Sequence, residues 1–100
     1  MKKIIFDALM KMDIIPAITE TREEGQKEYA HDVNNIFANF ERVADTLSIK
    51  REKVLMVYFL KHIDGIIAHI DGHKSQREHI HGRITDAIVY LTLLWGMLDE

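Results

Sequence analysis

Apolar residues recur at helical spacing along most of the chain. Near the N-terminus the stripe consists of Ile4, Ile5, Ala8, Leu9 and Met12. It predicts a short amphipathic helix over residues 2–12. Pro16 disfavours the helical conformation in the residue before it, so we expect this helix to end ahead of the proline. Residues 1–16 would then be an appendage, and residues 18–98 would form the core bundle.

A polar helix and a second amphipathic helix are predicted next. Residues 18–30 are rich in glutamate and predict a helix with little apolar surface. After a turn, a new apolar stripe predicts a helix over residues 36–47, which Asn34 or Asn35 could cap. Ser48 is expected to cap the helix that follows it.

Two long helices complete the chain, and we expect them to form an antiparallel hairpin. The first, over residues 50–71, ends at Gly72, a residue type favoured just after a helix C-terminus. The second, over residues 78–98, has apolar residues at a spacing of about 3.6. A short polar connection joins them, as in other helical hairpins. Residues 54–60 are apolar on every side of the helix, which indicates burial or a subunit interface.

Composition and length predict one domain. The 100 residues are 47% hydrophobic and 29% charged, with a single proline, as in globular proteins. No alternating strand pattern or internal repeat is present, so the predicted fold class is all-α, a small helical bundle. A chain of this size has little stability to spare, and together with the apolar run this predicts at least a homodimer.

Charge and residue usage exclude several partners. The net charge of −3, without a basic cluster, argues against binding to duplex DNA. The absence of cysteine excludes disulfides and thiolate zinc sites. No segment approaches the ~20 apolar residues of a membrane span, so we expect no membrane partner. The expected location is the cytoplasm.

A basic residue followed three positions later by an aspartate occurs on both long helices. The pairs are Lys61 with Asp64 and Arg83 with Asp86, and Tyr90 lies one turn beyond Asp86. An antiparallel hairpin would bring these side chains to the edge of an apolar groove. Arginine and lysine bind phosphate, and aspartates hold Mg²⁺ or accept hydrogen bonds from a sugar or base. The alternative is that both pairs are ordinary intrahelical salt bridges.

Further carboxylates suggest a metal site. Glu24 and Glu28 are one helical turn apart and could share a cation with Asp64 or Asp86. The candidate Mg²⁺ ligands are therefore Asp64, Asp86, Glu24 and Glu28. The alternative for the glutamates is a solvated acidic face.

Histidines and one tyrosine are weaker candidates. His69 and His73 have the i, i+4 spacing that permits two imidazoles on one metal. Histidines near the C-terminus of a helix also complement its dipole, which is the structural alternative. Tyr29, at the end of the polar helix, is a candidate platform for stacking a base.

Four phrases within residues 21–98 resemble a family of small bacterial and phage proteins, those carrying the "nucleotide modification associated domain 1". The phrases are KEYA, FANFERVADTLSI, KVLMVYFLKHIDGI and HGRITDAIVYLTLL. The positions that match the pattern of the family are Tyr29-Ala30, Asn39-Phe40, Lys61 to Asp64, and Gly82-Arg83 to Asp86-Ala87 with Tyr90. The resemblance implies a phage-type protein of the host cytoplasm that binds, and could sequester, a nucleotide or nucleotide-derived signal.

The residues then take definite roles in a groove between the last two helices, at a dimer interface. Lys61 and Arg83 would hold phosphate. Asp64 and Asp86 would orient the sugar, the base or Mg²⁺. A tyrosine, Tyr90 or Tyr29, would stack on the base.

A more distant resemblance is to the all-α, MazG-like nucleoside triphosphate pyrophosphatases. Those enzymes bind Mg²⁺ with an EExxE phrase on one helix and an ExxD phrase on a later one. Here Glu28 falls one position late, and Arg83 stands where the second glutamate is expected. The departure favours binding, with Mg²⁺-dependent pyrophosphate hydrolysis as the alternative. A third hypothesis is a helical adaptor that docks a host protein through residues 54–60.

Overall fold

The computed structural model describes residues 1–29, 34–73 and 79–100. Over these ranges the secondary structure is entirely helical, and the all-α prediction is confirmed. The elements are α1 (Lys3–Leu9), the π-helix η1 (Met10–Ile14), α2 (Ile15–Tyr29), α3 (Ala38–Leu47), α4 (Arg51–Ile70) and α5 (Ile80–Asp99).

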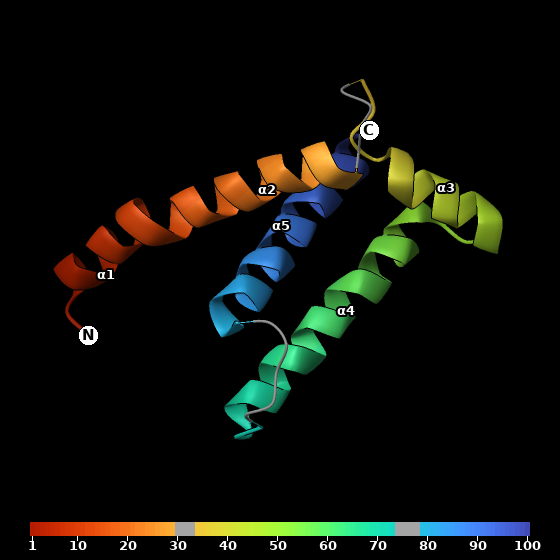
Figure 1. Cartoon of the computed structure of the whole chain (residues 1–100). Helices are drawn as coiled ribbons and strands as arrows, with labels where there is room; N and C mark the ends of the chain where they lie inside the picture. The colour runs from red at the N-terminus through yellow and green to blue at the C-terminus, as the bar shows by residue number, and fades with distance from the viewer. Residues whose placement is uncertain (30–33, 74–78) are drawn as a thin grey trace.

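The N-terminal helix does not end before Pro16. Instead α1, η1 and α2 follow one another as a single long rod (Figure 1). Proline breaks an α-helix because it lacks an N–H and clashes with the carbonyl four residues earlier. Here the chain switches to a wider turn just ahead of it, in which the Ile15 N–H donates to the Met10 carbonyl, five residues earlier. The π turn therefore lets the helix pass through the proline, and the prediction of a break was wrong.

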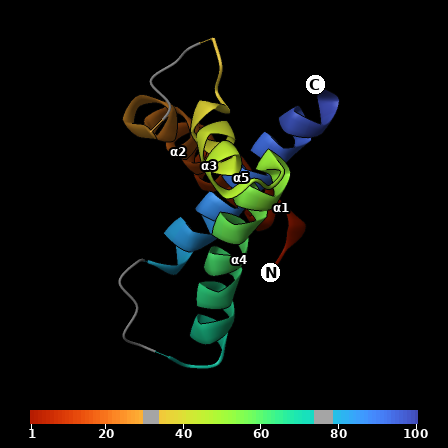
Figure 2. The same cartoon turned by 90° about the vertical axis from the view of Figure 1, so that its right-hand side faces the viewer.

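Helices α4 and α5 are the centre of the bundle. They lie side by side and run in opposite directions (Figures 1 and 2). The C-terminal part of the rod, α2, packs against α5, and α3 packs against α4. The four helices α2 to α5 therefore surround a common space.

Two left-handed residues end helices at the turns. Gly72 has a φ of +90° and follows α4, as predicted, and the His73 N–H returns to the Ala68 carbonyl. Ser48 has a φ of 56° and ends α3, where the Ile49 N–H returns to the Ala44 carbonyl in the same way. Ser48 was expected to begin the next helix, and this is corrected.

The core is small and lies where α3, α4 and α5 meet. Leu55 is fully buried, and Phe37 and Met97 pack with it. Gly96 permits this packing, because a Cβ atom at this position would stand only 3.1 Å from Cζ of Phe37. Six partly buried side chains surround the cluster: Ile36, Phe40, Met56, Tyr90, Leu93 and Leu94.

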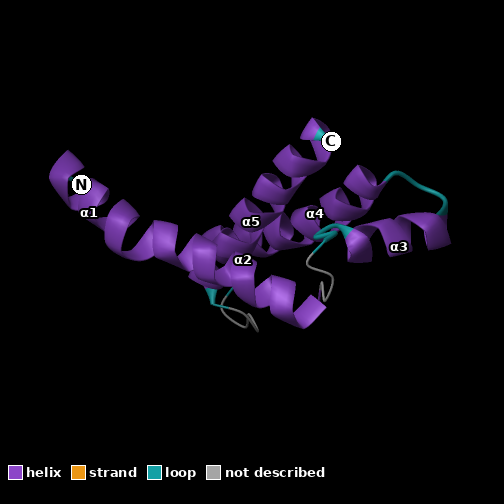
Figure 3. Ribbon diagram, turned by 90° about the horizontal axis from the view of Figure 1, so that it is seen from above, coloured by secondary structure: helices purple, strands orange, loops and turns teal. Residues whose placement is uncertain are grey.

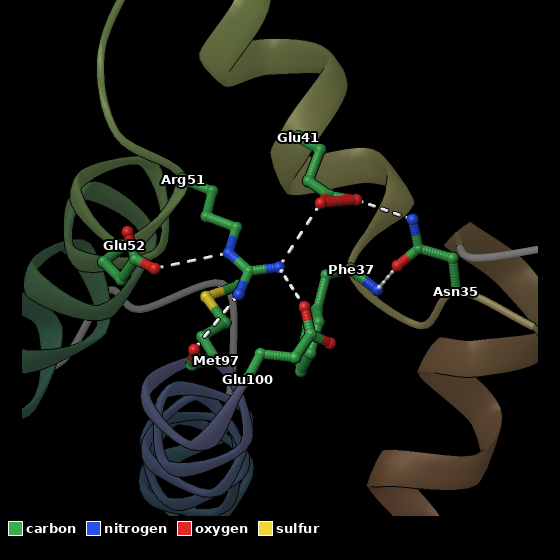
Figure 4. Close-up of polar contacts among 7 residues, drawn as sticks. All are labelled: Asn35, Phe37, Glu41, Arg51, Glu52, Met97 and Glu100. Carbon is green, nitrogen blue, oxygen red and sulfur yellow. Dashed lines mark hydrogen bonds and ion pairs between the residues drawn. The ribbon is translucent and has the colours of Figure 1, made fainter.

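Arg51 ties the same junction together by polar contacts (Figure 4). From the start of α4 its guanidinium donates to Glu100 at 2.9 Å, to the Met97 carbonyl at 3.1 Å and to Glu41 at 3.3 Å. It also stacks over the ring of Phe37, 5.1 Å from the ring centroid. The hydrogen bond to Glu100 raises the pKa of Arg51, so the guanidinium stays charged in any ordinary buffer.

The turn into α3 is attached to this cluster. Asn35 Oδ1 accepts the backbone N–H of Phe37 at 3.1 Å, and Asn35 Nδ2 donates to Glu41 at 2.6 Å (Figure 4). Asn35 therefore stabilises the turn ahead of α3 and does not cap the helix, because the N-cap residue is Phe37 and no side chain caps it; the prediction that Asn34 or Asn35 caps this helix was wrong.

The rest of the molecule is open. The radius of gyration is 15.3 Å, against about 13 Å for a compact domain of this length. Figure 3 shows α1 projecting away from the other helices. The apolar run over residues 54–60 is divided, because Val54 and Leu55 are buried whereas Val57 and Leu60 are exposed. Among the described residues, no helix is long and apolar enough to cross a membrane.

Candidate functional site

A groove of about 620 Å³ lies among helices α2, α3, α4 and α5. Its volume is within the range usual for small-molecule sites. The rod contributes Thr21, Arg22, Glu24, Gly25, Gln26 and Glu28. The central helices contribute Tyr58, His62, Asp86, Val89, Tyr90 and Leu93, and the segment around α3 contributes Ile36, Asn39, Phe40, Arg42 and Val43.

Aromatic rings form one side of the groove. Tyr58 and Tyr90 face each other nearly in parallel, with centroids 6.2 Å apart and an angle of 14° between the rings. Phe40 meets both edge-on, at 6.1 Å from Tyr58 and 6.3 Å from Tyr90. The arrangement is rigid because Phe40 and Tyr90 also pack on the core. It offers a flat aromatic surface of the kind that stacks on planar ligands.

A histidine and a carboxylate stand beside these rings. His62 Nε2 is 3.8 Å from Asp86 Oδ2, and the imidazole lies 5.7 Å from the ring of Tyr90. His62 is buried, whereas Asp86 is partly exposed. Helical spacing produces this grouping, because Tyr58 and His62 are one turn apart on α4, and Asp86 and Tyr90 one turn apart on α5. The groove thus joins a hydrogen-bonding carboxylate to an aromatic surface.

Charged side chains of both signs also line the groove. Arg22, Glu24 and Glu28 come from α2, and Arg42 comes from α3. Arg42 is exposed and Arg22 is partly buried. A guanidinium binds phosphate or carboxylate oxygens with two parallel hydrogen bonds. The groove therefore holds side chains that can receive an anionic group together with rings that can receive a planar one.

Some of the site residues predicted from the sequence line the groove, and others lie outside it. Asp86 and Tyr90 line the groove together with Glu24 and Glu28. Lys61 and Asp64 are exposed on α4 and are not among the described lining residues. Arg83 packs instead against α4, where a Cβ atom on Gly65 would overlap its guanidinium.

Arg83 is held by packing more than by polar contacts. Its Nε is buried and has no hydrogen-bond partner among the described residues. The close approach to α4 is possible because Gly65 has no side chain. The two basic-x-x-Asp phrases therefore differ: Lys61 and Asp64 face solvent, whereas Arg83 serves the packing of α4 against α5 and Asp86 faces the groove.

The candidate metal ligands are only partly gathered. Glu24, Glu28 and Asp86 line one groove, and Asp64 is outside its described lining. Within residues 1–29, 34–73 and 79–100, no group of three or more His, Asp or Glu side chains is placed to hold a metal ion. Mg²⁺ requires near-octahedral oxygen ligands at short distances. The side chains as they stand do not form such a cage.

The remaining candidates lie away from the groove. His69 and His73 are exposed at the end of α4. His79 has a structural role, because its Nδ1 accepts the backbone N–H of His81 at 3.2 Å and so caps α5. Tyr29 is the last residue of α2, and its side chain lies outside the described part of the molecule.

Reasoning from the sequence missed several groove residues. These are Arg22, Phe40, Arg42, Tyr58 and His62. Two signals were available: the i, i+4 spacing of Tyr58 and His62 on the same side of α4, and the place of Phe40 in the Asn39-Phe40 pair that matches the family pattern. Arg22 and Arg42 carry no local signal, because they come together only through the placement of α2 and α3.

Scans against protein-family models, curated proteins and solved structures gave no match to this chain.

Proposed function

We propose that the chain binds a nucleotide or a nucleotide-derived signal in the groove among α2, α3, α4 and α5. The observation that carries the proposal is the combination, in one groove, of a stacked aromatic pair, a carboxylate and two arginines. A nucleotide has the complementary parts: a planar base, hydrogen-bonding edges and an anionic phosphate.

The base would lie against the aromatic side. Tyr58 is partly exposed, so its ring is accessible from the groove. Stacking a base on an aromatic side chain contributes roughly 1–3 kcal/mol. Asp86 lines the same groove, one helical turn from Tyr90 and 3.8 Å from His62, so its carboxylate would accept a hydrogen bond from a base N–H or a sugar hydroxyl.

The phosphate would lie against Arg22 and Arg42. Lys61 and Arg83 are the phosphate ligands that the sequence predicts, but neither is among the described lining residues. We therefore assign phosphate binding to the two arginines that do line the groove. Glu24 and Glu28 on the same side repel excess negative charge, which favours a ligand with few phosphates.

A Mg²⁺-dependent nucleoside triphosphate pyrophosphohydrolase is the second candidate. One observation favours it: Glu24, Glu28 and Asp86 share the groove. Binding is the better-supported function because the described carboxylates are not arranged as a metal site. Release of pyrophosphate in the presence of Mg²⁺, abolished by Asp86→Asn, would favour hydrolysis instead.

Isothermal titration calorimetry tests the proposal. The chain would be titrated with nucleoside mono-, di- and triphosphates and with cyclic dinucleotides, with and without Mg²⁺. We expect at least one of these ligands to bind. Tyr58→Ala should weaken that binding by roughly 10-fold or more through lost stacking. Arg42→Ala should weaken it and also reduce its dependence on salt.

Lys61→Ala is the matched control. Lys61 lies less than one helical turn after Tyr58 on α4, but it is outside the described groove lining. Removing its charge should therefore leave the affinity within about twofold of the wild type. The proposal is wrong if no ligand binds at ~100 µM protein, or if Lys61→Ala weakens binding whereas Tyr58→Ala and Arg42→Ala do not.

A further inference from the structure

The N-terminal end of the rod presents apolar side chains to solvent. Helix α1 and the π-helix η1, together called the arm, contain no buried residue. Ile4, Ala8 and Met12 recur every four residues along one side, with Ile5 beside them. Ile4 is 76% exposed and Met12 is 73% exposed. Among the described elements, the arm has extensive contacts only along the rod itself.

A second apolar surface runs along the outside of α5. It consists of Ile84, Leu91, Trp95 and Leu98, called the acceptor stripe. At about 100° per residue these four positions fall within roughly 60° of the helix surface. Trp95 is 72% exposed, and its Nε1 donates to Asp99 at 3.1 Å. The hydrogen bond fixes an exposed indole, the side chain most often found at the energetic centre of protein interfaces.

We propose that the arm of one copy of this chain packs on the acceptor stripe of a second copy. The lengths agree, because Ile4 to Met12 spans roughly 12 Å of helix and Ile84 to Leu98 roughly 21 Å. The arm can therefore lie wholly on the stripe. In Figure 1 the arm projects away from the bundle, so a second molecule can reach it without displacing another helix.

Charges at the ends of the two surfaces set the direction. Lys2 and Lys3 precede the apolar residues of the arm, and Asp99 and Glu100 follow the acceptor stripe. An arm that runs antiparallel to α5 brings the lysines near the acidic pair; because Glu100 is already paired with Arg51 and Lys3 with Asp7, the new attraction comes mainly from Lys2 and Asp99. The opposite direction would place them near His79 and His81, at the other end of α5. The antiparallel contact is therefore favoured by charge.

The exposed area is sufficient for a reciprocal dimer. Each copy would contribute one arm and one acceptor stripe, which together hold seven large apolar side chains with exposure recorded between 39% and 76%. At roughly 100 Å² each they offer about 700 Å², close to the ~800 Å² that each partner contributes to a standard interface. A two-fold dimer closes both contacts at once and leaves no arm free.

Light scattering on the full chain at 10–100 µM tests the proposal. We expect the mass of a dimer. The arm variant, Ile4→Glu with Met12→Glu, and the acceptor variant, Trp95→Glu, should each have the mass of a monomer. Two controls add a carboxylate elsewhere on the same helices: Phe6→Glu, about 200° around α1 from Ile4, and Thr85→Glu, about 100° around α5 from Ile84. Both controls should remain dimeric, and circular dichroism should show that all variants are helical.

Mixing the two monomeric variants identifies the contact. The arm variant has an intact stripe, and the acceptor variant has an intact arm, so an equimolar mixture should form a heterodimer through one contact. If the dimer needs arm–arm and stripe–stripe contacts together, the mixture stays monomeric; if only one of these like-with-like contacts holds the dimer, one of the two variants is already dimeric alone. Either result shows that the proposal is wrong.

Cross-linking provides a readout that does not depend on disrupting the interface. The chain has no cysteine, so Ile5→Cys and Leu98→Cys introduce one thiol each. A short bismaleimide should join the two variants to one another in a mixture more efficiently than it joins either to itself. The proposal is wrong if the wild type is a monomer at 100 µM. It is also wrong if the wild type is a monomer that co-sediments with anionic lipid vesicles through its arm.

Discussion

The junction of α3, α4 and α5 and the N-terminal arm both contain apolar and charged residues. These side chains are buried and paired at the junction, whereas they are exposed on the arm. At the junction Leu55 is fully buried and Arg51 makes contacts to three acidic side chains. On the arm Ile4 is exposed, and Lys3 pairs only with Asp7 one turn away, at 2.6 Å. The comparison teaches that an apolar stripe indicates an interaction, but not whether its partner is in the same molecule. Matched substitutions in the two regions test this difference.

The largest difference is expected from truncating an apolar side chain in each region. Leu55→Ala should lower the free energy of unfolding by about 3 kcal/mol, because it leaves a cavity among Phe37, Met97 and their neighbours. Ile4→Ala should change the unfolding of the monomer by less than about 0.5 kcal/mol, since it removes no intramolecular burial. Urea denaturation, measured by circular dichroism at low protein concentration, compares the two. Equal losses would contradict the distinction.

Removing a cation gives the next effect. Arg51→Ala should cost about 2 kcal/mol, because the arginine is only 17% exposed and its loss removes a charged hydrogen-bond donor from Glu41, Glu100 and the Met97 carbonyl. Arg51→Lys should recover only part of this stability, because an ammonium cannot reproduce the forked contacts. Lys3→Ala removes a solvent-exposed i, i+4 pair and should cost less than about 0.5 kcal/mol. Thermal or urea unfolding of the three variants gives the ranking.

Two glycines on α5 differ in the same way: Gly82 faces open space, whereas Gly96 faces the core. Gly82→Ala should stabilise the protein by about 0.5–1 kcal/mol, because a Cβ atom there meets open space and alanine favours helix. Gly96→Ala should stabilise it less or destabilise it, since the new Cβ presses on Phe37 at 3.1 Å. The unfolding midpoint of Gly82→Ala should therefore exceed that of Gly96→Ala. The reverse order would show that Phe37 moves aside without cost.

The smallest expected effect is on stability at low pH, and it comes from Glu52. A hydrogen bond from its own backbone N–H, and then the pairing with Arg51, lower the pKa of Glu52 below the usual value of a free glutamate, about 4.5. A depressed pKa means that the ionised form stabilises the folded state. This contribution is present above about pH 4.5 and is lost as the pH falls through the lower folded pKa. The difference in stability between wild type and Glu52→Gln should therefore shrink between neutral pH and pH 3, whereas Arg51 stays charged throughout.

Much of the secondary structure could be predicted from local pattern. The 3.6-residue spacing of apolar residues located the two long helices, and Gly72 marked the end of α4 because its positive φ is a local requirement. Pro16 misled the prediction, because a π turn in the preceding residues satisfies its steric demand without ending the helix. Ser48 also misled the prediction: serine favours the start of a helix, but here it takes the less common left-handed conformation that ends α3.

The candidate site was predicted only in part. Asp86 and Tyr90 were found from their spacing on one helix, and Glu24 and Glu28 from theirs on another, and all four line the groove. Lys61 shares its local pattern with Arg83, but spacing within a helix does not reveal which way that face turns in the bundle. The structure leaves Lys61 in solvent and packs Arg83 against Gly65.

The sequence by itself determined that this chain is helical and where most of the helices lie, because helix formation and helix ends depend on residues within a turn or two of each other. Only the tertiary structure decided which faces meet. It brought His62 to Asp86, Tyr58 to Tyr90, and the arginines of α2 and α3 to one groove. It also left the apolar side chains of the arm and of the acceptor stripe exposed, because the described helices pack against one another through other faces.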